Sequence, residues 1–180
     1  VYLNAALELE KKKHPNKEII PAGIFYYQMK DPMVEKTEED QVQDALLKEL
    51  RPSGLVSSDP EVLNHLDHTG TRSSLAAPFA RNKDGSISKT SRAASRKEFE
   101  LLSSYTRKKT GQLKEEILEG NAKKEPYELG TSTGCDYCPY HGICGFDEKI
   151  EGCGYRNLVS QKREEIFRLI ARELSEWEGE

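Results

Sequence analysis

The residues best suited to chemistry are four cysteines confined to one stretch of the chain. Cys135 and Cys138 form a CxxC pair, Cys144 follows after five residues and Cys153 after eight more, and the other positions of the 180-residue sequence hold no cysteine. Thiolates that converge from such a stretch can bind one metal ion or an iron–sulfur cluster. We therefore favour a metal or cluster site over disulfides or unliganded thiols.

The spacing leaves two kinds of site open. Zinc would use Cys135, Cys138, Cys144 and either Cys153 or His141, which are all competent ligands. Structural zinc modules usually place two close ligand pairs across a longer spacer, whereas here the ligands follow singly after the first pair. That unevenness is nearer to the ligation of a cluster by four thiolates.

Two other groups look like sites only superficially. His65 and His68 lie three residues apart beside Asp67, and Asp147 to Lys149 resembles the end of a carboxylate and lysine nuclease motif. Both are interpreted as loop or surface residues. The sequence also lacks a glycine-rich phosphate loop, a nucleophile elbow and a Ser/His/Asp arrangement, so we expect no complete active site.

Composition limits the class of protein and its surroundings. The formal net charge is −4, which argues against a protein that coats nucleic acid by bulk charge. Charged residues make up 32% of the chain, and it has no apolar run long enough to span a bilayer. No signal peptide is visible, and cysteines confined to one cluster fit a reducing cytoplasm better than a secreted framework.

A local basic stretch carries a further prediction. Arg107, Lys108 and Lys109 lie together on a predicted long helix. A solvated helix face is the favoured interpretation, and contact with DNA phosphates is the alternative.

The elements that must position the cysteines are mostly helices. Residues 19–29 form a nearly continuous apolar and aromatic run, which predicts an inner strand buried on both faces, with neighbours expected outside this chain. Apolar spacing, capping residues and turn residues predict the other elements. These are a helix over 2–13, four more helices over 38–50, 59–66, 95–120 and 159–178, and a hairpin within 77–89. The expected fold class is α+β, mainly helical, with one buried strand and one candidate hairpin.

Several motifs follow one another in a distinctive order. They are Pro21 to Tyr27 followed by Asp31-Pro32, then Lys83-Asp84-Gly85, Cys135-x2-Cys138-Pro139-Tyr140-x3-Cys144-x-Phe146-Asp147, and Tyr155 to Leu158. Over residues 1 to about 158, this order resembles the carboxyl-terminal region of the AddB (RexB) family, the B subunits of bacterial AddAB-type ATP-dependent helicase-nucleases.

The resemblance implies an α/β RecB-like nuclease fold of the PD-(D/E)XK superfamily, in which carboxylates and a lysine hold Mg²⁺ and activate water. In that family these residues precede a helix with a Gln-x3-Tyr motif, and Tyr2 matches its tyrosine. The catalytic carboxylates and lysine would then precede Val1. We expect this chain to be inactive as a nuclease on its own.

The resemblance also implies a structural 4Fe-4S cluster. Cys135, Cys138 and Cys144 match three of its ligands, and the fourth ligand would lie upstream, outside this chain. Cys153 is additional to the family pattern, either as a bystander, which we favour, or as a substitute ligand. In the isolated chain the cluster could be absent or replaced by zinc. The cluster would staple together segments that are distant in sequence.

The expected organisation is one carboxyl-terminal part of a nuclease domain over 1–180. It comprises a helical and loop insertion at 38–95, a cysteine segment at 134–158 and a terminal helix at 159–178. The parent would use ATP and resect double-strand breaks for recombinational repair in the cytoplasm. Its partners would be the A subunit of the helicase-nuclease, double-stranded DNA ends and single-stranded DNA, but no membrane.

Two alternatives remain. A Cas4-like iron–sulfur nuclease shares the three-cysteine ending, but the long stretch at 38–95 argues against it, because Cas4-like chains are compact. A stand-alone zinc-binding interaction module would not explain the buried strand, which requires a larger sheet.

Overall fold

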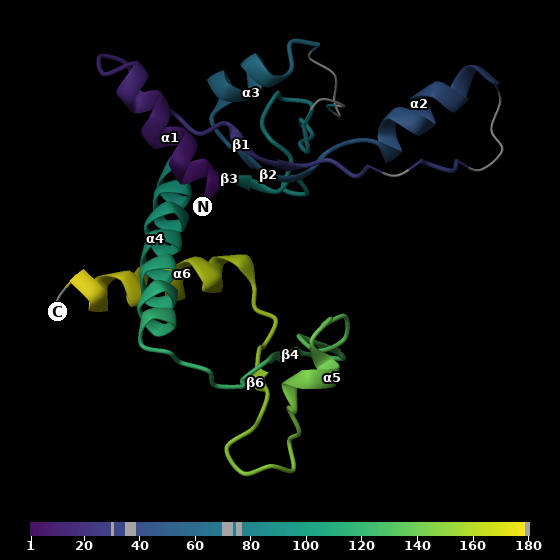
Figure 1. The fold of residues 1–180 in the computed structure, drawn as a ribbon. Coiled ribbons are helices and arrows are strands. Elements are labelled where there is room, and N and C mark those ends of the chain that lie inside the picture. The colour runs from purple at the N-terminus through teal and green to yellow at the C-terminus, as the bar shows by residue number, and fades with distance from the viewer. Residues whose placement is uncertain (30, 35–38, 70–73, 75–76, 179–180) are drawn as a thin grey trace. The chain divides into compact units, whose positions relative to one another are not determined.

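The computed structural model describes residues 1–29, 31–34, 39–69, 74 and 77–178. The chain forms two compact units, Val1–Thr106 and Arg107–Glu180. Figure 1 shows the elements in chain order. They are α1 (Tyr2–Lys13), β1 (Gly23–Tyr26), α2 (Glu39–Glu49), β2 (Ser53–Ser57), α3 (Pro60–Leu66), β3 (Ala93–Ala94), α4 (Arg96–Leu118), β4 (Tyr127–Leu129), β5 (Ser132–Thr133), α5 (His141–Cys144), β6 (Arg156–Asn157) and α6 (Arg163–Glu178).

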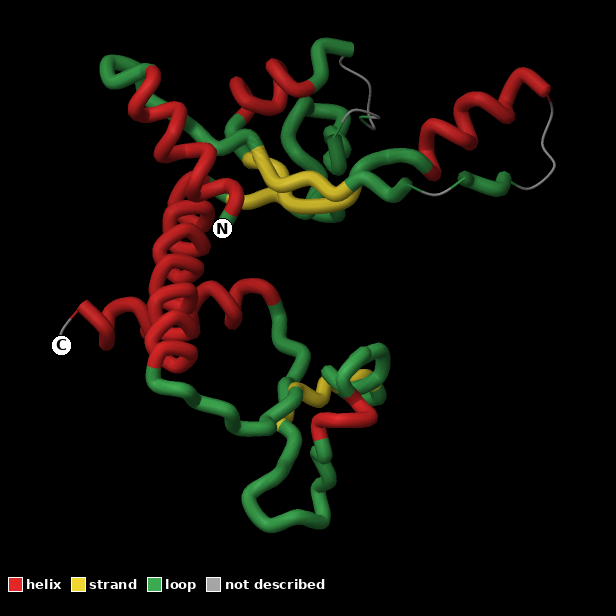
Figure 2. Tube along the Cα trace, in the orientation of Figure 1, coloured by secondary structure: helices red, strands yellow, loops and turns green. Residues whose placement is uncertain are grey.

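The first unit contains a three-stranded mixed sheet in the order β1-β2-β3 (Figure 2). β1 runs antiparallel to β2, with Gly23 opposite Val56. β2 runs parallel to β3, with Val56 opposite Ala93. The middle strand therefore comes from residues 38–95, which the sequence predicted as a helical and loop insertion without a strand at 53–57. Glu38, the first residue of that predicted insertion, lies outside the described residues.

The core of the first unit is small and lies against β2. Val56, Leu63, Ala77 and Phe79 form a buried hydrophobic cluster. Val56 comes from β2 and Leu63 from α3, so the cluster joins the sheet to the helix that follows it. Phe25, Leu66, Ile87 and Ala93 pack around this cluster as partly buried neighbours.

The prediction of a fully buried inner strand over 19–29 was wrong in two respects. Only Gly23–Tyr26 forms a strand, and its hydrogen-bonded partner, β2, lies within this chain. Among the described residues β1 is an edge strand, and Tyr26, Tyr27 and Met29 are exposed. A continuous apolar run predicts burial, but it cannot show which strand pairs with it.

The helix predictions based on capping residues are confirmed. The Asp59 carboxylate accepts the Glu61 N–H at 2.9 Å and begins α3. At the start of α4, the Ser95 N–H donates to the Glu98 carboxylate at 2.7 Å and the Glu98 N–H donates to Ser95 Oγ at 3.3 Å. This reciprocal pair is a capping box.

The candidate hairpin within 77–89 is reduced to a tight turn. Arg81 and Ile87 form an isolated antiparallel bridge across it. At the tip Gly85 has φ +82°, a conformation that glycine adopts without strain. No longer ladder extends from this turn among the described residues.

The second unit contains a smaller sheet in the order β5-β4-β6. β4 pairs antiparallel with β5, with Glu128 opposite Thr133, and parallel with β6, with Tyr127 opposite Arg156. The terminal helix α6 begins at Arg163 instead of residue 159 and buries Ile170 and Leu174. In the described part of the chain, no helix is long and apolar enough to cross a membrane.

Candidate metal-binding segment

All four cysteines lie between β5 and β6 of the second unit. Cys135 follows β5 after one residue, Gly134, and Cys138 ends the next turn. Cys144 is the last residue of α5, and Cys153 lies between two glycines. Cys144 is exposed and the other three are half-buried. The segment thus offers soft thiol ligands at a surface that an ion or cluster can reach.

The CxxC pair is held in place by a hydrogen-bonded turn around Thr133. The Thr133 hydroxyl and N–H donate to the Asp136 carboxylate at 2.6 and 3.0 Å, and the Cys135 N–H donates to Thr133 Oγ1 at 3.2 Å. The hydrogen bond from the Thr133 hydroxyl lowers the pKa of Asp136. The Cys138 N–H then donates to the Cys135 carbonyl at 3.2 Å, which fixes the turn between the two thiols.

Cys144 is positioned by a lysine from outside the cysteine segment. Lys124 Nζ donates to the carbonyls of Cys144 and Gly145 at 3.4 and 3.2 Å, at the C-terminal end of α5. Gly145 closes this short helix with φ +62° in the left-handed region. Lys124 therefore satisfies orphan carbonyls and brings a positive charge beside the third cysteine.

Aromatic packing joins the end of the segment to the residues that follow Cys144. The rings of Phe146 and Tyr155 meet edge to face, with centroids 4.9 Å apart. Interaction with the Cys135 side chain raises the pKa of Tyr155 above its ordinary value. A cavity of about 400 Å³ lined by Cys153, Tyr155 and Arg156 lies at this end of the loop.

The donor set fits a cluster or zinc by its chemistry, but the cysteines do not converge. Among the described residues, no group of three or more His, Cys, Asp or Glu side chains is arranged to hold a metal ion. None of the four thiols is in a disulfide. The structure thus places Cys135, Cys138 and Cys144 in one loop without closing a ligand cage around a single point.

The groups interpreted as loop or surface residues have local roles. His65 is an exposed residue of α3. Its Nδ1 lies 2.8 Å from the Glu61 carbonyl oxygen, and its ring lies edge-on to that of His68. In the cysteine segment, the Asp147 carboxylate accepts the Lys149 N–H at 2.9 Å and closes a turn. Neither arrangement resembles a site.

Of the three basic residues on α4, Lys108 is not available on a solvated face. Its side chain is 7% exposed, and Nζ donates to the Glu173 carbonyl at 2.7 Å. Lys109 Nζ lies 2.6 Å from the Glu173 carboxylate. Lys108 and Lys109 therefore join α4 to α6, while Arg107 is exposed. For Lys108 the favoured interpretation of a solvated helix face is wrong, because its ammonium is buried and bonded inside the fold. Contact of the three basic residues with DNA stays a prediction.

Two positioning residues were missed because sequence spacing does not reveal them. Lys124 precedes the cysteine segment in a stretch without periodicity, so only the fold shows its contact with Cys144. Tyr155 belongs to a motif that contributed to the family resemblance, but no role followed from that motif. Tyr2, the expected match to a nuclease motif, is 92% exposed at the start of α1.

Comparison with known proteins gives consistent matches. The sequence pattern of the PD-(D/E)XK nuclease superfamily matches residues 1–145. The chain is 36% identical over 178 residues to the B subunit of the ATP-dependent helicase/deoxyribonuclease of Thermoanaerobacter sp. (strain X514), covering 97% of this chain and 15% of that protein.

Proteins with the same name from two other organisms match this chain to a similar extent. The identity is 39% over 175 residues for Alkaliphilus metalliredigens (strain QYMF), covering 96% of this chain and 15% of the relative. It is 37% over 177 residues for Clostridioides difficile (strain 630), covering 94% of this chain and 15% of the relative. The chain thus spans about one-seventh of the length of these curated relatives. It belongs to the PD-(D/E)XK nuclease superfamily.

Proposed function

We propose that the chain is the carboxyl-terminal part of the nuclease domain in the B subunit of an ATP-dependent helicase/deoxyribonuclease. The observation that supports this most strongly is its 36–39% identity to such proteins over almost its whole length. The parent protein would be a hydrolase that acts on DNA with ATP and Mg²⁺. Its partners would be DNA ends and a second subunit, and its role would be to resect double-strand breaks for recombinational repair in the cytoplasm.

Within that parent, Cys135, Cys138 and Cys144 would be three ligands of a 4Fe-4S cluster. When bound, the cluster would cross-link this segment to a fourth ligand outside the chain. The chain's own residues prepare the loop: Thr133 fixes the CxxC turn, and Lys124 holds the end of α5. In the described residues the three cysteines do not form a complete ligand set, which is compatible with a fourth ligand from outside the chain.

The catalytic carboxylates and lysine are proposed to lie outside residues 1–180. The described residues provide scaffold: a mixed sheet in the first unit and the cysteine segment in the second. Tyr2 would contribute to the nuclease site from the start of α1, where its side chain is exposed.

The deciding experiment is metal and acid-labile sulfide analysis of the full-length protein purified without oxygen, together with its visible absorbance spectrum. We expect about four iron and four sulfide per protein, as for one 4Fe-4S cluster. Stoichiometric zinc without iron would contradict the cluster and would favour a zinc-binding interaction module.

The same analysis on the 180-residue chain tests Cys153. Since the fourth ligand is proposed to lie outside the chain, we expect little iron there. Retention of a full cluster would show that four local thiolates suffice. Cys153 would then be a ligand, and the proposal of an outside ligand would be wrong.

A further inference from the structure

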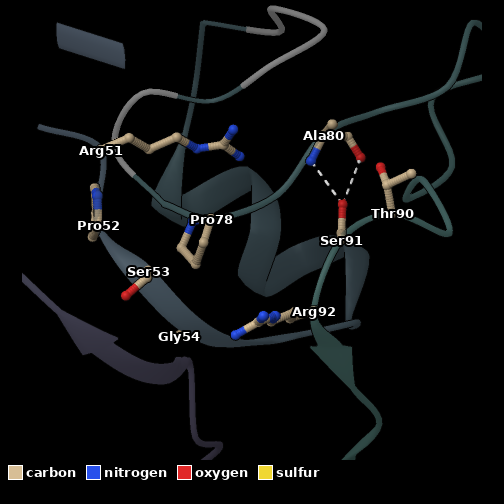
Figure 3. Close-up of a pocket in the computed structure, with 9 residues that line it drawn as sticks. All are labelled: Arg51, Pro52, Ser53, Gly54, Pro78, Ala80, Thr90, Ser91 and Arg92. Atoms are coloured by element: carbon tan, nitrogen blue, oxygen red, sulfur yellow. Dashed lines mark hydrogen bonds between the residues drawn. The ribbon is translucent and has the colours of Figure 1, made fainter. Parts of the chain in front are cut away.

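A pocket of about 320 Å³ lies beside β2 in the first unit, and none of its lining residues belongs to the cysteine segment (Figure 3). Its lining residues include the arginines Arg51 and Arg92 and the hydroxyl residues Ser53, Thr90 and Ser91. No acidic residue is among the lining residues. In a chain with a formal net charge of −4, this pocket is a local concentration of positive charge and hydroxyl groups.

The backbone that holds Arg92 is fixed on both sides. The Arg92 carbonyl accepts the Val56 N–H at 3.0 Å, in the β2–β3 ladder. Ser91 Oγ accepts the Ala80 N–H at 2.8 Å and lies 3.3 Å from the Ala80 carbonyl, as the dashed lines in Figure 3 show. A ligand that binds the Arg92 side chain would therefore not have to order the backbone, which lowers the entropic cost of binding.

The two arginines play different parts. Arg51 Nη2 donates to the Phe79 carbonyl at 2.7 Å, and its guanidinium also contacts the Ala77 carbonyl at 3.3 Å, so it provides a fixed positive charge. Arg92 is exposed, and its guanidinium has no hydrogen-bond or ion-pair partner among the described residues. In Figure 3 its side chain reaches along the pocket toward Gly54. The N–H groups of Arg92 can thus donate to a ligand, while Arg51 contributes positive electrostatic potential to the pocket.

We propose that this pocket binds one phosphate group of a nucleic-acid backbone, with Arg92 as the direct ligand. The planar guanidinium donates two parallel hydrogen bonds to a phosphate, and arginine, serine and threonine supply many backbone contacts to DNA. A neighbouring fixed cation and the absence of carboxylates from the pocket lining favour an anion. The nucleic-acid assignment rests on the proposed function, whereas the anion site rests on the pocket alone.

The first test uses inorganic phosphate as the probe. Hydrogen exchange of the full-length protein is compared in phosphate and in chloride of equal ionic strength, for peptides that cover residues 86–94. We expect slower exchange in phosphate for the unaltered protein and no such effect for Arg92→Gln. The matched control is Arg168→Gln, which removes the same charge from an exposed position on α6 outside the pocket lining.

The second test measures binding of a single-stranded oligonucleotide at increasing salt. Loss of one phosphate contact should make the slope of log affinity against log salt shallower by about 0.7, uniformly across sequences. We expect this change for Arg92→Gln and an unaltered slope for Arg168→Gln. If Arg92→Gln unfolds, Arg92→Lys keeps the charge without the bidentate fork, and it should retain the slope but bind more weakly.

The outcomes separate the hypotheses. A slope that becomes shallower, with or without slower exchange in phosphate, supports the backbone contact. Hydrogen exchange that slows in phosphate only when Arg92 is present, with an unchanged salt dependence of oligonucleotide binding, would show that the pocket binds free phosphate. That result would overturn the assignment to a DNA phosphate. If neither quantity depends on Arg92 while the protein still binds DNA, the site is wrong and the proposed function stands. Absence of any DNA binding by the unaltered protein would overturn the nucleic-acid assignment together with the proposed function, and the exchange test in phosphate would then decide the anion site alone.

Discussion

Asn4 and Ser103 exchange two hydrogen bonds between α1 and α4. Asn4 Nδ2 donates to the Ser103 carbonyl at 3.0 Å, and Ser103 Oγ donates to Asn4 Oδ1 at 2.7 Å. Asn4 is the buried residue of α1, with 9% of its surface exposed. A polar pair thus holds the first helix of the first unit to the α4 residues of that unit.

The first prediction follows from this pair. Asn4→Ala should lower the free energy of unfolding by about 1–3 kcal/mol, because the Ser103 hydroxyl and carbonyl lose their partner in a partly buried place. Urea unfolding measures the change. Asn16→Ala is the matched control and should be neutral, because Asn16 is exposed and its side chain forms no hydrogen bond with the residues that the structure describes. Equal effects of the two changes would contradict the role of the pair.

A second prediction concerns two glycines of different surroundings. Gly54 has φ +138°, and a Cβ there would collide with the Ile24 carbonyl oxygen of β1. Gly54→Ala should therefore separate β1 from β2 and destabilise the first unit by more than about 2 kcal/mol. Gly111, within α4, has open space around its Cβ position, so Gly111→Ala should stabilise the helix by about 0.5–1 kcal/mol. Unfolding midpoints that move in the same direction would contradict this prediction.

A third prediction is a pH dependence at the contact between α4 and α6. A hydrogen bond from Lys109, with the charges of Lys109 and Lys108, lowers the pKa of Glu173 below its ordinary value of 4.5. A carboxyl with a lowered pKa in the folded state stabilises the fold above its ordinary pKa. This contribution is lost as the pH falls through the lowered value.

Lys109→Met should therefore lower the unfolding temperature near neutral pH, and the difference from the unaltered protein should shrink as the pH falls well below 4.5. The effect is small because the Glu173 side chain is 36% exposed. Lys114→Met, at an exposed position of α4, serves as the control. A difference that is the same at all pH values would rule out the titration of Glu173 as its source.

The helices could be predicted from the sequence because their signals are local. Asp59-Pro60 and the Ser95 to Glu98 capping box each act within one turn, and both helices begin where these residues place them. The pairing of β1 with β2 could not be predicted, because α2 separates the two strands in the chain and an apolar run does not show which strand it pairs with. The cysteines were found from their clustering alone, whereas the contacts of Lys124 and Tyr155 depend on tertiary structure.

A fourth prediction concerns the cysteines in the full-length protein. Cys135→Ser, Cys138→Ser or Cys144→Ser should each remove most of the iron, lower the unfolding temperature and weaken binding to DNA ends, because the proposed staple loses a ligand. Cys153→Ser is the control and should keep the iron. Unchanged melting and DNA binding in all three variants would refute a structural cluster.

A fifth prediction is that the 180-residue chain does not cleave DNA with Mg²⁺ or Mn²⁺. In the part of the chain that the structure describes, no carboxylates are gathered to hold a divalent ion. Incubation with labelled linear DNA at increasing protein concentration measures this, with the full-length protein complex as the positive control. Cleavage that rises with the concentration of the 180-residue chain would show that a catalytic centre lies within it.

The β4–β5 pair joins strands that follow each other closely in the chain, whereas the other strand pairs of the two described sheets join positions about 30 or more residues apart. Position 56 pairs with positions 23 and 93, so the first sheet must close long loops before its contacts form. In the second sheet, positions 128 and 133 meet across a tight turn. Because short loops close faster and at a lower entropic cost, we expect the β4–β5 turn beside the CxxC pair to form early in refolding. We therefore expect the backbone that carries Cys135 to be ordered while the first sheet is still open.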